Sequence, residues 1–390
     1  MHETDDHLYA LSGFKITPDD QDRAPVAGSP QSSYNTPAGR CKTAIQLPGY
    51  LTWNPANGHY GQSERFIMTQ CVLLDGLPGS GKSTTAHLLS RHLQAQGATT
   101  NWFFEHDTSH PIFEHERIIH YMTTGDFDAS LFDEAPKKWR AMCDTRAETD
   151  DITILESSFF QSPIHVLLLN GTGLREIMSY VMSCAVVIEP LRPRLVYLGL
   201  PDPAIALERA CTCRGDWFAP FLEQVLERSE WGRTSPLDGQ EAVLAYFADY
   251  IQTVDELVAR LPFPTCVIDI SDGNHERINQ LLCQFLELPA MDSSIPPTHS
   301  PERFAGRYLA RKSGEEFTVF VEEGVLRAHG PSSAAMIPLS GTVFEILGLN
   351  VRITFDEPDD EGIYQLVRFE GNLPGLEAEW QRITDDAVRN

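Results

Sequence analysis

The segment LLDGLPGSGKST (residues 73–84) is the most informative part of the sequence. An apolar run ends at Asp75, a glycine-rich turn follows, and Lys82 and Ser83 open a stretch with helical spacing of its apolar residues. Residues 76–83 match G-x-x-x-x-G-K-[S/T] at every fixed position, and average residue usage gives a chance match in a chain this long a probability of about 1–2%. The strand before the motif and the helix after it are the context that phosphate binding requires. The sequence therefore predicts a phosphate-binding loop.

Each residue type in this loop has a physical role. The three glycines let the backbone curl so that consecutive N–H groups point at the phosphates, and the helix that follows adds the positive end of its dipole. Lys82 is expected to reach the β- and γ-phosphates, and Ser83 to offer its hydroxyl to Mg²⁺. Because the sequence has no N-K-x-D guanine signature, we expect ATP as the nucleotide. The residues predicted to bind it are Gly76, Leu77, Pro78, Gly79, Ser80, Gly81, Lys82, Ser83 and Thr84.

Beyond the loop, strand-like and helix-like segments alternate. Short apolar runs typical of buried parallel strands lie at residues 70–76, 100–106, 151–158, 193–200 and 265–271. Helical spacing occurs at residues 80–97, 112–123, 133–149, 174–189, 203–231, 238–261 and 274–287. Strands separated by helices predict an α/β fold with a doubly wound, five-stranded parallel sheet. Right-handed crossovers then bring the carboxyl ends of the strands to one edge.

The remaining segments differ in composition. Residues 1–66 are rich in Pro, Gly, Ser and Thr without a sustained apolar period, which predicts a disordered N-terminal arm. Residues 291–303 have the composition of a linker. In residues 304–390 the apolar period changes to two between Gly, Asp and Pro turns, which predicts a small antiparallel β-barrel or sandwich.

Charge and cysteine content limit the classes of partner. The formal net charge of −25 repels nucleic-acid backbones and anionic membranes, so we expect neither as a partner. The eight cysteines lack paired spacing, which favours reduced thiols. No apolar run approaches the roughly 20 residues of a membrane span, and the acidic start MHETDDH does not resemble a signal peptide. These observations predict a cytoplasmic protein.

With its phosphate loop and five strands, the segment 67–288 resembles the nucleoside- and nucleotide-kinase branch of P-loop proteins, and we expect residues 67–290 to form a kinase-like domain. The resemblance implies an ATP- and Mg²⁺-dependent phosphotransferase that moves the γ-phosphate to a hydroxyl of a small molecule. In deoxynucleoside kinases a carboxylate at the end of the second strand takes the proton of the acceptor hydroxyl, and Glu105 has the matching position. The acidic-Arg-Ser run of that family is Glu156-Ser157-Ser158 here, without the arginine.

The same family carries arginines in a lid that stabilises the moving phosphoryl group. Arg209 and Arg214, in ALERACTCRGDW, have the corresponding position, with Arg228 and Arg233 behind them. Because strand ends face the loop crevice, the residues after the second and third strands are expected to form the acceptor pocket. They are Glu105, His106, Asp107 and His110, then Glu156, Ser157, Ser158 and Gln161. Either Glu105 or Glu156 is the predicted general base.

The C-terminal segment loosely resembles the β module that follows the catalytic domain of some penicillin-recognising hydrolases. The similar stretches are GRYLAR (306–311), EEGVLRAHG (322–330) and MIPLSGTVF (336–344), which carry no chemistry. We therefore expect this β domain to pack against other parts, to cover a ligand or to support a homodimer.

Three alternatives remain open at this point. The chain could be a P-loop ATPase or a nucleotide-switched binding protein that acts through its β domain. It could be a polynucleotide end kinase, which the acidic charge disfavours. The histidines of residues 106–120 could serve a metal or acid–base role, although His115 and His120 are five residues apart and do not share one helix face.

Overall fold

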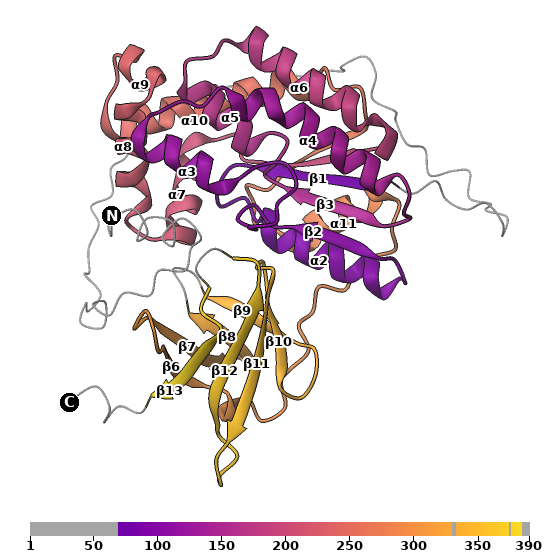
Figure 1. Ribbon diagram of the computed structural model, residues 1–390, viewed down its shortest axis with the longest axis vertical. Helices are drawn as coiled ribbons and strands as arrows, with labels where there is room; N and C mark the ends of the chain where they lie inside the picture. The colour runs from indigo at the N-terminus through magenta and orange to yellow at the C-terminus, as the bar shows by residue number, and fades with distance from the viewer. Residues whose placement is uncertain (1–68, 330–332, 374–375, 384–390) are drawn as a thin grey trace, which may run out of the picture. The chain divides into compact units, whose positions relative to one another are not determined.

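The computed structural model describes residues 69–329, 333–373 and 376–383, so the predicted N-terminal arm lies outside the described residues. The described chain forms a five-stranded parallel sheet with helices, followed by a closed, eight-stranded antiparallel barrel (Figure 1). The predicted fold class is confirmed, and the β region is a barrel and not a sandwich. The predicted domain and linker bounds stay predictions.

The parallel sheet has its first strand at the centre. Its strands are β1 (Cys71–Gly76), β2 (Thr100–Phe103), β3 (Ile152–Glu156), β4 (Arg194–Gly199) and β5 (Thr265–Asp269), in the order β2-β3-β1-β4-β5. Every residue of β1 is buried, as expected for an apolar strand between two parallel neighbours. The chain places β2 and β3 on one side of β1 and then β4 and β5 on the other. In sheets of this kind, ligands bind beyond the carboxyl ends of the strands at the point where the chain changes sides.

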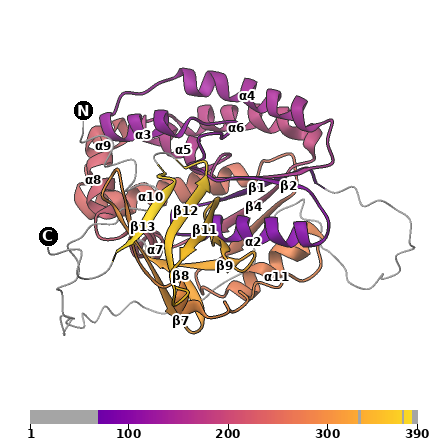
Figure 2. The same cartoon turned by 60° about the horizontal axis from the view of Figure 1, so that its bottom comes forward.

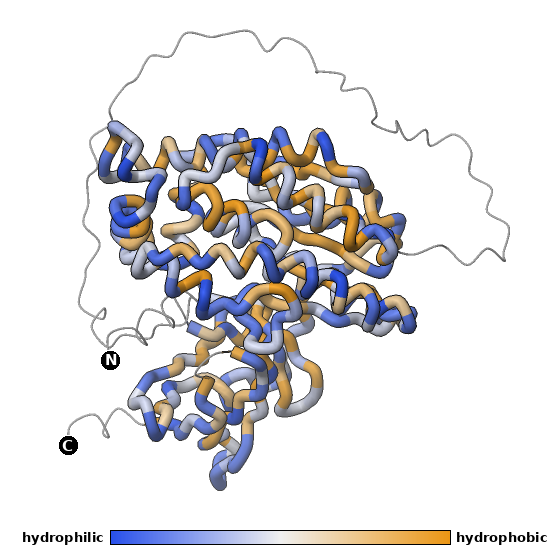
Figure 3. Tube along the Cα trace, turned by 45° about the horizontal axis from the view of Figure 1, so that its top comes forward, coloured by the Kyte–Doolittle hydropathy of each residue, from blue (hydrophilic) through white to orange (hydrophobic). Residues whose placement is uncertain are grey.

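Helices cover both faces of this sheet. The helices α4 (Ser130–Arg146) and α6 (Leu174–Ile188) lie over one face, and α2 (Lys82–Ala95) and α11 (His275–Leu286) lie over the other (Figures 1 and 2). The further helices are α3 (His115–Thr124), α5 (Gln161–Leu169), α7 (Pro203–Arg214), α8 (Phe218–Arg228), α9 (Glu230–Thr234) and α10 (Gly239–Val258). Hydrophobic residues gather inside this part of the chain and hydrophilic residues along its outer helices (Figure 3). Within the described ranges, no helix combines the length and the apolar character needed to cross a bilayer.

Two helix predictions need correction. The expected helix over residues 203–231 is three helices, because the chain turns at Gly215, whose φ is +93°, and has an extended backbone at Ser229. Helix α5 was not expected at all. Seven of the nine residues of its sequence, QSPIHVLLL, are buried, so it lacks the alternation of buried apolar and exposed polar faces that identifies a helix.

The barrel closes through pairing of its last strand with its first. Its strands are β6 (Gly306–Ala310), β7 (Glu316–Glu322), β8 (Val325–His329), β9 (Ala334–Pro338), β10 (Val343–Ile346), β11 (Val351–Pro358), β12 (Tyr364–Gly371) and β13 (Glu379–Ile383). Each strand is antiparallel to both neighbours, and β13 pairs with β6 while β9 pairs with β10. The side chains of Tyr308, Phe317, Phe344 and Phe355 are buried in its core. Aromatic packing therefore fills the interior of the barrel.

The loop between β1 and α2 packs against helix α7. At Gly79 the backbone has φ +78°, and a Cβ placed there would lie 2.8 Å from the backbone nitrogen of Ala210. Contacts that short do not occur with real Cβ atoms, so only glycine allows the loop to approach the α7 backbone this closely.

The carboxylate of Asp75, at the end of β1, holds the start of helix α5. Its Oδ2 accepts hydrogen bonds from the backbone N–H groups of Phe159 and Phe160 at 3.2 and 3.0 Å, and its Oδ1 accepts one from Gln161 at 2.8 Å. The side chain is fully buried, and burial raises the pKa of Asp75 to about 6 although these hydrogen bonds lower it. These three hydrogen bonds fix the start of α5 to the end of β1.

Substitution of Gly79 should cost more stability than substitution of a glycine with the same backbone and free space. Gly97 is a matched control, because its φ is +85° and a Cβ there would meet nothing within 4 Å. Gly97→Ala carries only the left-handed strain of about 1–2 kcal/mol. Gly79→Ala adds a backbone clash and should lose about 1–3 kcal/mol more in urea unfolding. Equal losses in the two variants would contradict the packing of the loop on α7.

The Asp75 carboxyl should make stability depend on pH. Its pKa in the folded chain, about 6, lies above the unfolded value of about 3.9. The contribution of this carboxyl to the free energy of unfolding is therefore complete at low pH and is lost as the pH rises through 6. The stability advantage of the wild type over Asp75→Asn should therefore shrink by about 1 kcal/mol between about pH 5 and about pH 7.5. Urea unfolding of both proteins at the two pH values measures this difference. An advantage that stays constant or grows would show that Asp75 has an ordinary pKa.

Candidate active site

The phosphate loop contains buried polar groups, and one of them has no hydrogen-bond partner among the described residues. The Lys82 side chain is buried, and its Nζ donates a hydrogen bond to the Leu77 carbonyl at 3.1 Å. No side chain caps α2 at Gly81, and the buried Ser80 Oγ has no hydrogen-bond partner among the described residues. Free donors around a buried ammonium suit an anion. The loop thus fits a bound phosphate chain by its own chemistry.

The carboxylate of Glu156 lies at the end of β3, beside this loop. It is fully buried, and neither of its oxygens has a hydrogen-bond partner among the described residues. Burial and the charge of Glu105 hold its pKa well above the usual range, while the Ser83 hydroxyl and Lys82 act in the opposite direction. A buried carboxylate near a serine hydroxyl is a set of hard oxygen donors of the kind that Mg²⁺ takes. Ser83 and Glu156 therefore fit a hydrated magnesium ion.

The carboxylate of Glu105 is held by three neighbours. Its Oε1 lies 3.2 Å from Nε2 of His106 and 3.6 Å from Nη2 of Arg214, and its Oε2 accepts a hydrogen bond from the Gln161 amide at 3.0 Å. Burial alone would raise the pKa of Glu105, but His106, Lys82 and Arg214 together hold it well below the usual range. Glu105 is therefore ionised at neutral pH.

The structure separates the arginines that the sequence grouped as a lid. Arg214, at the end of α7, lies beside Glu105, and its guanidinium stacks 5.0 Å from the ring of Phe218. Arg209 donates to the carbonyl groups of Ile270 and Ser271, both at 2.8 Å, and these bonds hold it at the end of β5. The other two predicted arginines, Arg228 and Arg233, bond to carbonyl groups and to Glu230. Only Arg214 of these four reaches Glu105.

The histidines of residues 106–120 have separate surroundings. His106 and His115 are hydrogen-bonded to each other at 2.9 Å. His110 accepts two backbone N–H groups at Nδ1, so its proton is on Nε2, which donates to Ser158 at 2.8 Å. His120 is exposed. Among the described residues, no three His, Cys, Asp or Glu side chains come together as a metal site.

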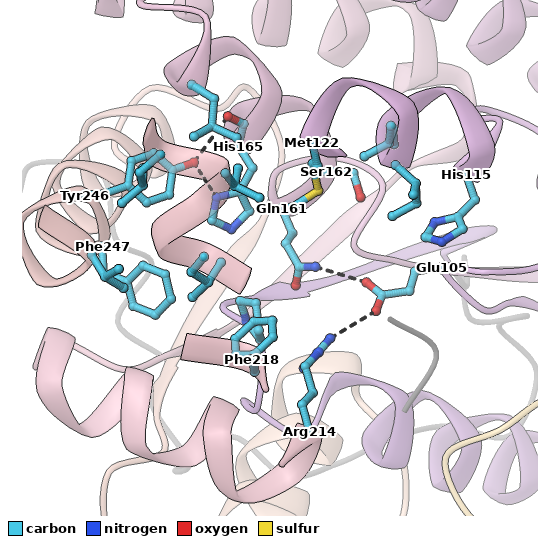
Figure 4. Close-up of a pocket in the computed structure, with 18 of the residues that line it drawn as sticks. Glu105, His115, Met122, Gln161, Ser162, His165, Arg214, Phe218, Tyr246 and Phe247 are labelled. Carbon is cyan, nitrogen blue, oxygen red and sulfur yellow. Dashed lines mark hydrogen bonds and ion pairs between the residues drawn. The ribbon is translucent and has the colours of Figure 1, made fainter. Parts of the chain in front are cut away.

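A cavity of about 90 Å³ opens beside Glu105 (Figure 4). Its wall includes Pro78 of the phosphate loop, Glu105, Arg214, and Gln161 and His165 of α5. Figure 4 shows the carboxylate of Glu105 between the Gln161 amide and the Arg214 guanidinium, with His165 bonded to Tyr246. Lys82, Glu156 and Arg209 are not among the residues that line this cavity. The phosphate loop and Glu105, one of the two predicted bases, therefore line the same cavity.

Sequence reasoning missed the part of the wall that does not follow a strand. His165 lies on α5, which was not expected, and the apolar wall comes from α3, α8 and α10. The signal available in the sequence was the position of Asp75, because a carboxylate inside an otherwise apolar strand needs a partner such as a helix N-terminus. Gln161, which the sequence places after the third strand, lines this cavity.

Comparisons with known proteins give one kind of match. No protein-family model and no curated protein matches this chain. Among solved structures, the chain is similar to deoxyadenosine kinase from M. mycoides with bound dATP, at 16% sequence identity and a TM-score of 0.35. That match covers 56% of this chain and 99% of the other. The assignment of a function therefore depends on the residues of the site itself.

Proposed function

We propose that this protein is a P-loop phosphotransferase that moves the γ-phosphate of ATP to a hydroxyl of a small molecule. The observation that carries the proposal is the composition of one cavity wall. Pro78 of the phosphate loop, the ionised Glu105 and the cationic Arg214 all line it. A donor site, a base and a positive charge at one cavity are the parts that phosphoryl transfer needs.

The loop binds and orients the ATP substrate. Lys82 and the backbone N–H groups of the loop hold the triphosphate, as the motif requires. Burial lowers the pKa of Lys82, and the negative charge of a bound triphosphate acts to raise it again. Ser83 and Glu156 hold Mg²⁺, which when bound neutralises charge on the phosphate oxygens.

Glu105 is the proposed general base, in preference to Glu156. Glu105 lines the cavity and is ionised, whereas Glu156 is not among the lining residues and has a raised pKa. The acceptor oxygen forms a bond to the γ-phosphorus, the bond from that phosphorus to the β,γ-bridging oxygen breaks, and ADP leaves. The acceptor proton goes to Glu105, and Arg214 offsets charge on the group in transfer.

Fate of the γ-phosphate tests the reaction class. The full-length protein is incubated with γ-labelled ATP and Mg²⁺, with and without a desalted pool of cellular metabolites, and the products are separated. We expect label in a small organic compound only when the pool is present. Label that appears only as inorganic phosphate, at a rate the pool does not change, would indicate an ATPase or nucleotide switch instead.

Two substitutions assign the roles of the site residues. Lys82→Ala should abolish ATP turnover while the chain stays folded, because the ammonium is needed at the phosphates. Glu105→Gln should slow transfer about 10²–10⁴-fold and leave the ATP dissociation constant nearly unchanged. The matched control is Glu116→Gln, at an exposed glutamate of α3, which should behave as wild type. Loss of ATP affinity in Glu105→Gln would make Glu105 a structural or metal-site residue.

A further inference from the structure

Away from Glu105, most of the cavity wall is apolar, with a few polar residues such as Ser162 and His165 among its lining. The apolar part includes side chains from three helices: Ile119 and Met122 of α3, Leu222 and Val225 of α8, and Val243 and Phe247 of α10. Among the lining residues, the carboxylate and guanidinium groups are those of Glu105 and Arg214, which lie together at one place. A phosphorylated acceptor needs cations around its phosphate, and a free sugar needs a polar partner for each hydroxyl. Apart from Arg214, the described residues of the wall include no arginine or lysine side chain, and its polar residues, such as Ser162 and His165, are too few to partner every hydroxyl of a sugar.

Two buried polar atoms interrupt the apolar surface. Oε1 of Gln161 and Nε2 of His165 both belong to lining residues, and neither has a hydrogen-bond partner among the described residues. These residues are four apart on α5, so they share one helix face and are separated by about 6 Å along its axis. Buried polar atoms without partners are costly, and in a cavity wall they indicate where polar groups of a ligand bind.

Both atoms are oriented as hydrogen-bond acceptors. The Gln161 amide must present its NH₂ group to the carboxylate of Glu105, which leaves Oε1 as an acceptor. The Tyr246 hydroxyl is placed to donate to the His165 carbonyl at 3.2 Å. With its proton there, its oxygen accepts from Nδ1 of His165 at 2.7 Å, and in that tautomer Nε2 has no proton. The His165 ring also stacks on Tyr250 at 4.3 Å, which fixes its orientation. Burial lowers the pKa of His165 to about 3, so the ring is neutral in the physiological range.

We propose that the phosphoryl acceptor is an uncharged alcohol with an apolar body, whose far end carries a second hydrogen-bond donor that binds Nε2 of His165. The proposal rests on the proposed function, because it takes the occupant of this cavity to be the acceptor. The reacting hydroxyl lies at Glu105, the apolar body contacts α3, α8 and α10, and the second donor lies one helical turn along α5. The cavity volume of about 90 Å³ holds on the order of six water molecules, which suits a compound with a single ring.

A pair of probes that differ in one group tests this assignment. p-Hydroxyphenethyl alcohol carries a donor at each end of an apolar ring, and p-methylphenethyl alcohol replaces the phenolic hydroxyl with a methyl group of similar size. Their binding to the full-length protein with ADP and Mg²⁺ is measured by ligand-observed NMR, beside ribose and thymidine. We expect the hydroxyl probe to bind about tenfold more tightly than the methyl probe, because the methyl probe leaves Nε2 of His165 without a partner. Ribose and thymidine should bind more weakly than either probe.

A substitution assigns that discrimination to His165. His165→Leu should bind the two probes equally, whereas His120→Leu, at an exposed histidine outside the cavity wall, should keep the tenfold difference. Nucleotide binding in the same samples shows that each variant is folded. Equal binding of the two probes by the wild type, or tighter binding of ribose or thymidine, would overturn the proposal and leave the phosphotransferase assignment intact. If the wild type does not bind ADP, the result would instead contradict the proposed function.

Discussion

The hydrogen bonds from the start of helix α5 to the carboxylate of Asp75 are the constraint on which the rest of the site depends. Asp75 lies in the central strand β1, one residue before the phosphate loop begins. Its hydrogen bonds join this strand to α5, a helix that follows a different strand, β3. Gln161, the first residue of α5, donates its backbone N–H to Asp75 and its side chain to Glu105. Gln161 therefore links the buried Asp75, beside the phosphate loop, to the proposed base.

The site contains cationic side chains although the chain as a whole is strongly acidic. The protein carries a formal net charge of −25, yet Lys82 and Arg214 are placed beside two buried carboxylates. These carboxyl groups differ in pKa. The positive charges around Glu105 lower its pKa, whereas burial and the charge of Glu105 raise the pKa of Glu156. Two carboxyl groups at one site thus have pKa values that are shifted in opposite directions by their surroundings.

The sequence was sufficient for the features that depend on local pattern. The G-x-x-x-x-G-K-[S/T] motif and the alternation of strands and helices predicted the α/β fold, and the period of two predicted the β region. Strand-end logic placed Glu105 and Gln161 together. It did not separate Arg209 from Arg214, because the turn at Gly215 and the bonds of Arg209 to the end of β5 are tertiary effects. Helix α5 was missed because burial of seven of its nine residues removes the amphipathic period.

The closed ring of barrel strands has a consequence for molecular recognition. An open sheet can accept an extended peptide as an extra strand, because its edge presents unpaired backbone N–H and C=O groups. Here β13 pairs with β6 and β9 with β10, so every strand of the barrel has two neighbours. Any molecule that recognises this barrel, including a second copy of the chain, must therefore do so through side chains and connecting loops, and not by extending the sheet.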